Sequence, residues 1–293
     1  MIRIEWDPLD ASTATLIDRV VRVDGIELCD RVFDMRWLGD GQIMTFSDDN
    51  MVRWWKDGVD IARSHRGSGG LPIRAVISAN GDRIALVGTT LVEVEVVPAR
   101  RIFHEWLDGH DARLGLSVEL SGDGTRLAVG YIAGGENRGR GFMVYDVDRG
   151  KLVDRNFFPH AVGLEDLLGL ALDYPGKRLA QAVPEPVTSL GVIRVDTGEI
   201  YPRRMPGDAT AVAMDRSGEL VAYAYREPPD GARGRLRFDY LDRAAKGGVL
   251  VDVLDTQWLE CELPSISAMA FSHDRRRLAC LSLTGAIEIV PVP

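Results

Sequence analysis

A recurring hairpin unit is the feature of this 293-residue sequence that most restricts its fold. Six segments share one shape: an apolar alternating strand, a tight turn built on Gly, Asp or Asn, and a second strand rich in Leu, Ala and Val. The turns are separated by 40, 43, 52, 42 and 57 residues. Their equivalent positions are Gly41, Gly81, Gly124, Gly176, Gly218 and Arg275. Repeats of about 40 to 50 residues built from short strands are typical of β-propellers, whose unit is a four-stranded antiparallel sheet.

The repeat predicts an all-β chain with a single β-propeller domain over residues 1–293 and six four-stranded blades. Seven blades are the alternative, because the longest intervals could each hide a further sheet. The last unit ends after one further strand at Gly285–Val290, and the segment Thr15–Val23 precedes the first complete unit. We expect this N-terminal segment to close the ring by pairing beside Gly285–Val290, since an open ring would leave two sheet edges with unpaired backbone groups.

Two dipeptides and one longer stretch carry a family resemblance. The third unit opens with Gly109-His110 and ends its third strand with Tyr145-Asp146, and the first unit contains SDDNMVRWW at Ser47–Trp55. In these places the chain resembles the WD-repeat propellers, with Asp49 at the turn position and Trp54 near the aromatic position of the family's pattern. Only one unit has a Gly-His, and none has a literal Trp-Asp. The resemblance implies the propeller fold, but it does not carry over the family's partners.

Net charge and cysteine content restrict the classes of partner and the cellular compartment that we expect for the protein. The formal net charge is −9, so neither nucleic acid nor an anionic membrane is an expected partner. No apolar run approaches the roughly 20 residues that cross a bilayer, and the first residues do not read as a secretory signal. The cysteines, Cys29, Cys261 and Cys280, are widely spaced and odd in number. We therefore expect a cytoplasmic protein with buried, reduced thiols.

Signatures of catalysis are few in the sequence. The five histidines form no HxH or HExxH motif, and neither GxSxG nor GxxxxGK[ST] occurs. Glu119 and Asp173 are the only obvious acids on the expected inner strands, too few for a metal cage. We therefore expect a protein that is not an enzyme and has no catalytic, cofactor-binding or metal-binding residues. The alternative is a propeller-type hydrolase or lactonase with a cation in the central channel.

Long connections between second and third strands occur in three consecutive units, at Gly134–Gly141, Pro184–Ser189 and Glu227–Arg235. In a propeller these connections all emerge on one face, and loops on a rigid scaffold are where binding is usually placed. Arginine suits bidentate contact with carboxylates, and large aromatic side chains are frequent anchors at interfaces. We predict that this face binds a protein or an acidic peptide. The residues assigned to it are Arg138, Arg140, Arg233 and Arg235, with Trp54, Trp55 and Trp106 as aromatic anchors.

The function predicted from the sequence is that of a non-catalytic protein-interaction scaffold or a subunit of a larger assembly. A further segment that suits docking lies in the long insertion of the fifth unit, which contains Trp258. The identity of the partner and the pathway are not determined by the sequence.

Overall fold

The computed structural model of the chain describes residues 2–7, 9, 12–65, 72–88, 91–97, 100–106, 112–133, 139–159, 169–183, 189–195, 197, 199–204, 208–226, 234–241, 253–263 and 265–293. These residues form seven antiparallel sheets, in each of which every strand pairs with the next one along the chain. Six sheets have four strands, and the last has three. The chain is a single all-β propeller in which each sheet is one blade. Nothing in this described part is a helix long and apolar enough to cross a membrane.

Within each blade the strands run in chain order from the centre of the ring outward. Blades 1 to 4 contain β1 (Ile2–Trp6), β2 (Thr13–Ile17), β3 (Val20–Val23) and β4 (Ile26–Cys29); β5 (Val32–Trp37), β6 (Ile43–Ser47), β7 (Met51–Lys56) and β8 (Val59–His65); β9 (Arg74–Ile77), β10 (Arg83–Val87), β11 (Leu91–Val96) and β12 (Arg100–Trp106); and β13 (Ala112–Leu120), β14 (Arg126–Ala133), β15 (Gly139–Asp146) and β16 (Lys151–Pro159). Blades 5 to 7 contain β17 (Gly169–Leu172), β18 (Arg178–Val183), β19 (Ser189–Arg194) and β20 (Glu199–Arg204); β21 (Asp208–Met214), β22 (Leu220–Arg226), β23 (Gly234–Leu241) and β24 (Val253–Cys261); and β25 (Ile266–Phe271), β26 (Arg277–Ser282) and β27 (Ile287–Pro291).

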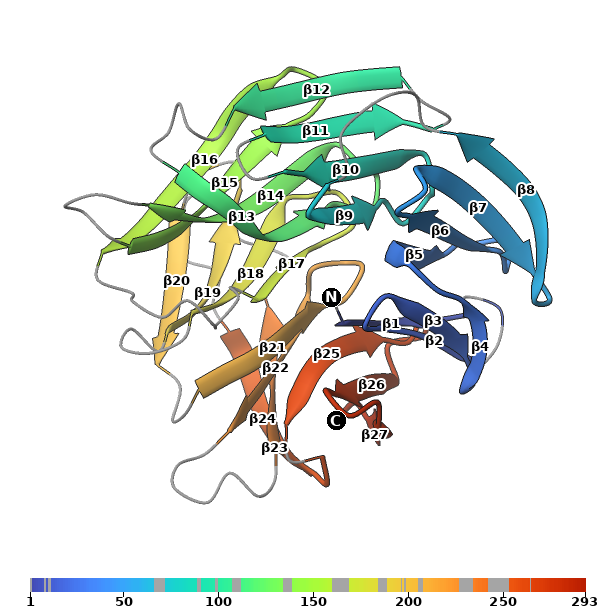
Figure 1. Ribbon diagram of the computed structural model, residues 1–293. Coiled ribbons are helices and arrows are strands. Elements are labelled where there is room, and N and C mark those ends of the chain that lie inside the picture. Colours follow the sequence, from blue (N-terminus) through green and yellow to red (C-terminus); the bar gives the residue numbers. More distant parts are fainter. Residues whose placement is uncertain are drawn as a thin grey trace.

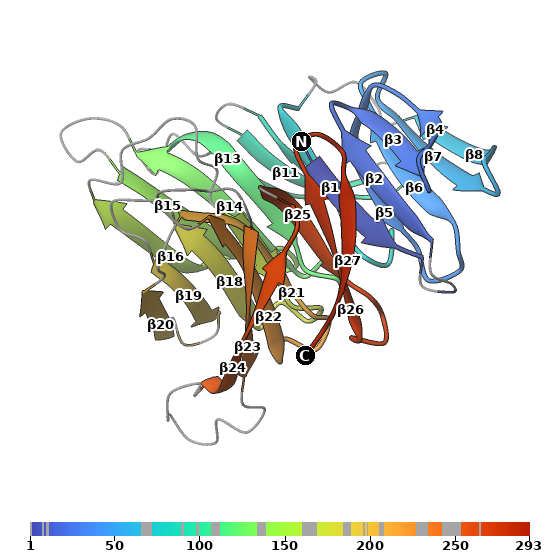
Figure 2. The ribbon, with the colours of Figure 1, turned by 90° about the horizontal axis from the view of Figure 1, so that it is seen from below.

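The first strands of the blades form a closed ring. Each of β1, β5, β9, β13, β17, β21 and β25 contacts the next, and β25 contacts β1 again. Figure 1 shows the blades around a common centre, with the N-terminal blade beside the C-terminal one, and Figure 2 shows the same neighbours from below. The sheet that begins the chain therefore meets the sheet that ends it.

Two details of the predicted ring are corrected by this topology. The blade number is seven, the stated alternative, rather than six. Residues Thr15–Val23 do not pair beside β27: they belong to β2 and β3, which lie between β1 and β4 in blade 1. The physical reason is that Ile2–Trp6 pairs in full register with Thr13–Ile17, so the N-terminal segment satisfies its backbone hydrogen bonds within a blade of its own.

Closure of the ring depends on side-chain packing between blade 1 and blade 7. Ile4 and Trp6 are buried against Ala279 and Leu281. The Trp6 indole Nε1 donates a hydrogen bond of 2.8 Å to the Ala270 carbonyl. The two ends of the chain are therefore joined face to face, and not by a strand shared within one sheet.

The core lies between the blades. Seven hydrophobic clusters are found among the described residues, and each joins two adjacent blades. Phe46 of blade 2 and Ile77 of blade 3, for example, are both fully buried in one of them. Because most inner strands are covered by a neighbouring blade on each side, they read as apolar runs with imperfect alternation.

The turn between the first and second strand of a blade, here called the hairpin turn, also joins neighbouring blades. Gly124 has a φ of +73°, and a Cβ on it would lie 2.6 Å from the Arg83 Cδ of the preceding blade. The Arg83 guanidinium donates a hydrogen bond of 2.9 Å to the Gly124 carbonyl. Between blades 5 and 6, Arg178 donates to the Gly218 carbonyl in the same way. The glycine in the repeat thus serves the turn and the close approach of the next blade together.

Candidate functional site: the central channel

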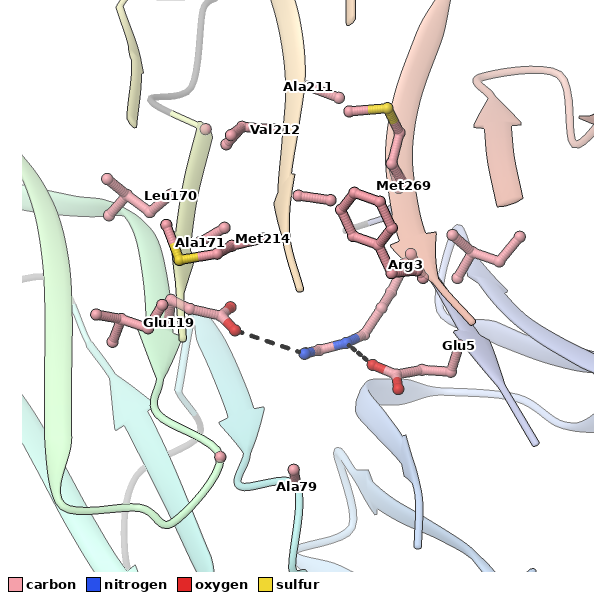
Figure 3. A pocket seen from close by; sticks show the side chains of 18 of the residues that line it. Arg3, Glu5, Ala79, Glu119, Leu170, Ala171, Ala211, Val212, Met214 and Met269 are labelled. Carbon is pink, nitrogen blue, oxygen red and sulfur yellow. Dashed lines mark hydrogen bonds and ion pairs between the residues drawn. The ribbon is translucent and has the colours of Figure 1, made fainter. Parts of the chain in front are cut away.

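The inner strands enclose a cavity of about 1660 Å³ along the centre of the ring. Its wall has two unlike parts. The inner strands of blades 1, 2, 3 and 4 contribute charged side chains, and those of blades 5, 6 and 7 contribute mainly small or apolar ones. Arg216 and Arg275 line the cavity from the hairpin turns of blades 6 and 7. Figure 3 shows both parts, with Arg3 between Glu5 and Glu119 on one side and Leu170, Val212 and Met269 on the other.

The charged part is a network centred on Arg3. Its guanidinium lies 2.8 Å from the Glu5 carboxylate and 2.7 Å from that of Asp34. Arg36 lies 2.8 Å from the same Glu5 oxygen, and both arginines lie 4.0 Å from Glu119. Asp34 also accepts a hydrogen bond of 2.7 Å from the Ile77 amide. Ion pairs therefore connect blades 1, 2 and 4 across the channel.

Burial sets the electrostatics of this network. It opposes charge on Arg3, but Asp34, Glu5 and Glu119 more than offset it, and the pKa of Arg3 lies above its ordinary value. The pKa of Glu119 is raised by burial, against the opposing effect of Arg3 and Arg36. Removing Arg3 would leave the buried Asp34 carboxylate without its ion pair, which is far more costly than the pair itself is favourable.

The apolar part of the wall is formed by the inner strands β17, β21 and β25. Every second residue along the part of these strands that lines the channel is small, which keeps the channel wide. These small residues are Gly169, Ala171, Ala211, Ala213, Ala268 and Ala270. Leu170, Val212, Met214 and Met269 lie between them and are only partly buried. This side of the channel suits an aliphatic or aromatic group.

Most of this site was not predicted from the sequence. Glu119 lines the channel as expected, but Asp173 does not: it is buried below its hairpin turn and accepts hydrogen bonds from the Lys177 and Arg178 amides. Burial raises the pKa of Asp173 to about 6. Arg3 and Glu5 were missed because the first strand was not recognised. The alternation of Ile2–Trp6, apolar and charged by turns, is the signal that would have revealed it.

A metal site has no ligand set in the described part of the chain. No group of three or more His, Cys, Asp or Glu side chains is placed there to hold an ion. The carboxylates of the channel are instead engaged by Arg3 and Arg36.

The arginines predicted to bind a partner are described only in part. Arg138 and Arg233 lie outside the described residues. Arg140 and Arg235 are each the second residue of the third strand of their blade, in β15 and β23, so the fold places both at the face from which the long connections emerge. The Arg235 guanidinium lies 3.9 Å from Glu260 on the outer strand. The binding role of this set stays a prediction.

The predicted aromatic anchors differ in their surroundings. Trp54 is partly buried against the cluster between blades 2 and 3. Trp55 is partly buried against the cluster between blades 1 and 2, and its Nε1 donates to the Thr45 hydroxyl at 2.9 Å. Trp106 is the last residue of β12. Trp258, on the outer strand β24, is 48% exposed and packs edge-on against Tyr225. It is the most exposed of the tryptophans named here whose side chains the structure describes.

The three-stranded blade 7 leaves β27 as an outer edge. Ile287 and Ile289 on this strand are 39% and 47% exposed. The residues between and after them, Glu288 and Val290, face blade 6, where Glu288 lies 2.9 Å from the Cys261 sulfur. One side of the strand thus belongs to the core, and the other presents two isoleucines to solvent.

The residues that resemble the WD-repeat pattern have structural roles of their own. Gly109-His110 lies outside the described residues. Tyr145 is buried at the end of β15, and Asp146 accepts a hydrogen bond of 2.9 Å from the Arg149 amide and lies 3.0 Å from Arg126. Asp146 therefore closes the following turn and holds the second strand of its own blade.

Comparisons with known proteins bear on the fold alone. No protein-family model and no curated protein matches the sequence. Among solved structures, the chain is similar to a chain of Kuenenia stuttgartiensis hydrazine synthase, with 14% identity over 99% of this chain and 95% of that chain and a TM-score of 0.67. It is also similar to a chain in a crystal structure of the mitotic checkpoint complex, with 14% identity over 100% and 89% of the two chains and a TM-score of 0.66. At this identity the likeness shows a propeller, and the similarity to WD repeats remains one of pattern and fold.

Proposed function

We propose that this propeller is a non-catalytic scaffold that holds a protein partner, as a subunit of a larger assembly in the cytoplasm. The observation that carries the proposal is the open edge of blade 7. In the described part of the chain six blades have four strands and blade 7 has three, and its outer strand β27 carries the exposed Ile287 and Ile289. Exposed strand edges are templates for pairing with another chain, and proteins ordinarily cover or blunt them.

The hydrogen bonds of β27 show which of its groups are available. The Val292 amide donates to the Arg276 carbonyl, and the Ser282 amide donates to the Ala286 carbonyl. The backbone amides and carbonyls of the even-numbered residues of β27 therefore point toward β26. Those of Ile287 and Ile289 point outward. Pro291, next in this outward series, has no amide hydrogen, as is typical of edge strands. The edge offers a short segment that an incoming strand can extend.

The partner that fits this edge is an extended protein segment with apolar side chains. Its backbone would pair with Ile287 and Ile289, and its apolar residues would cover their side chains. The structural neighbour from the mitotic checkpoint complex supports a role within an assembly, since that propeller belongs to one. The arginine-bearing face is the second contact that we propose, for an acidic stretch of the same partner.

Affinity purification from the native cell tests the proposal with matched variants of a tagged full-length chain. We expect Ile287→Lys/Ile289→Lys to lose the proteins that co-purify with the wild type, because a charged edge repels strand addition. Ile61→Lys is the control, since Ile61 is 50% exposed on the outer strand of a complete blade. It should retain the partner.

A second set of variants addresses the arginine-bearing face. Reversal of charge at Arg138, Arg140, Arg233 and Arg235 should weaken capture further and make the remainder less sensitive to salt. Unchanged capture by both the edge variant and the charge-reversed variant would rule out the proposal. Stoichiometric Ca²⁺, Mn²⁺ or Zn²⁺ in the purified protein would instead favour the hydrolase alternative.

A further inference from the structure

Arg74 is a cation in the channel that no described residue neutralises. It is the first residue of β9, and its partly buried side chain lines the cavity. Within the described ranges nothing accepts a hydrogen bond from its guanidinium or forms an ion pair with it. Burial lowers the pKa of Arg74 below its ordinary value. Arg3 of blade 1 and Arg36 of blade 2 are each paired with Glu5, so Arg74 differs from both of them.

Ser117 lies at the matching position on the next blade. Arg74 is four residues before Ser78, the first residue of its hairpin turn, and Ser117 is four residues before the equivalent Ser121. Their strands, β9 and β13, are in contact. The Ser117 hydroxyl oxygen is buried, and it has no hydrogen-bond partner among the residues described. Two unsatisfied donors thus lie at one level of the channel on adjacent strands.

The wall across the ring from blade 3 is the apolar one. In a ring of seven blades, blades 6 and 7 lie opposite blade 3. They present Val212, Met214 and Met269, which are only partly buried (Figure 3). These residues lie between small ones such as Ala211 and Ala268. Covering apolar groups that are open to a cavity lowers the free energy of the complex, in proportion to the apolar area removed from water.

We propose that the channel binds a small carboxylic acid with an aliphatic body, its carboxylate held by Arg74 and the Ser117 hydroxyl and its body against the wall formed by blades 6 and 7. The guanidinium offers a fork of N–H donors that matches a carboxylate, and the hydroxyl donates to one of its oxygens. The single guanidinium of Arg74, which has no ion-pair partner among the described residues, suits a monoanion, whereas a phosphate dianion would retain negative charge in a poorly solvated site. The cavity of about 1660 Å³ exceeds the volume of a ligand of this size and leaves space for water beside it.

Isothermal titration of the full chain with sodium octanoate, 1-octanol and octyl phosphate tests this site. We expect octanoate to bind the wild type about tenfold more tightly than octanol, from a charge-assisted hydrogen bond. Arg74→Gln should abolish that preference, Arg74→Lys should keep part of it, and Ser117→Ala should weaken octanoate about threefold. Arg276→Gln is the control, because Arg276 is exposed outside the channel lining, and it should bind octanoate like the wild type.

Several results would overturn the proposal. They are no octanoate binding to the wild type at millimolar concentration, equal affinity for octanoate and octanol, and an undiminished preference in Arg74→Gln. Tighter binding of octyl phosphate than of octanoate would overturn the carboxylate assignment. A thermal melt accompanies each titration, and if Arg74→Gln is unfolded, the values for Arg74→Lys and Ser117→Ala decide the question.

Discussion

Arg3 illustrates how one residue joins several blades. It lies on the first strand of blade 1, contacts Asp34 of blade 2 at 2.7 Å, and extends toward Glu119 of blade 4 at 4.0 Å. The side chain of Asp34 is fully buried, so its charge depends on this contact and on the Ile77 amide. At the residue scale, the channel is organised by charges that cannot be removed singly.

Replacing Arg3 by Gln should lower the free energy of unfolding by about 3–5 kcal/mol, because it leaves the Asp34 carboxylate buried without its cation. Arg3→Gln/Asp34→Asn should recover part of this loss, since the Asn side-chain carbonyl can still accept from the Ile77 amide. Arg22→Gln is the control. It breaks an exposed pair with Glu27 at 3.5 Å and should change stability by less than about 1 kcal/mol. Urea denaturation measures all three, and a similar loss in Arg3→Gln and Arg22→Gln would contradict the argument.

The hairpin turn is the element that repeats most faithfully, and it has two functions. Positive φ closes the turn between the first two strands, and at Gly124, Gly176 and Gly218 the absence of a side chain admits an arginine from the preceding blade. At Gly124 this arginine is Arg83, which is also held by Asp148 at 2.9 Å. The repeated turn glycine is therefore required both by the turn itself and by packing between neighbouring blades.

Gly124→Ala separates these two functions when compared with Gly58→Ala. Gly58 has a similar φ of +76°, but a Cβ there would meet no atom within 4 Å. The backbone penalty of roughly 1–2 kcal/mol is common to both substitutions. Gly124→Ala should cost about 1–3 kcal/mol more, because the Arg83 side chain must move from its hydrogen bond. Equal losses in urea or thermal denaturation would show that the packing of Arg83 contributes nothing.

At the scale of the whole molecule, stability depends on one junction that joins the ends of the chain. Trp6 fills the interface between blades 1 and 7, and the Arg277 guanidinium lies 4.7 Å from the centre of its ring. Every other junction joins blades that are consecutive along the chain. The junction at Trp6 joins residues more than 260 positions apart, so it forms only when the ring is complete.

Trp6→Ala should destabilise the protein by about 3–5 kcal/mol through the cavity and the lost indole contacts. Hydrogen exchange should accelerate on both sides of the junction, at the amides of Ile4 and Leu281, before it does so in blade 4. Trp258→Ala is the matched control, because Trp258 is 48% exposed, and its loss should be smaller. Faster exchange confined to blade 1 would show that the two ends are not coupled.

The sequence by itself determined most of the strands, the hairpin turns of blades 2 to 7 and hence the propeller, because side-chain alternation and the turn chemistry of Gly, Asp and Asn are local properties. Blade number, ring closure and the channel lining were decided by tertiary structure. The N-terminal strand is not followed by a turn glycine like those of blades 2 to 6, so its alternation marks a strand, but its pairing with Thr13–Ile17 is what establishes blade 1. Arg3, Arg74 and Ser117 share a level of the channel only because seven strands meet around one axis, and no local pattern records that arrangement.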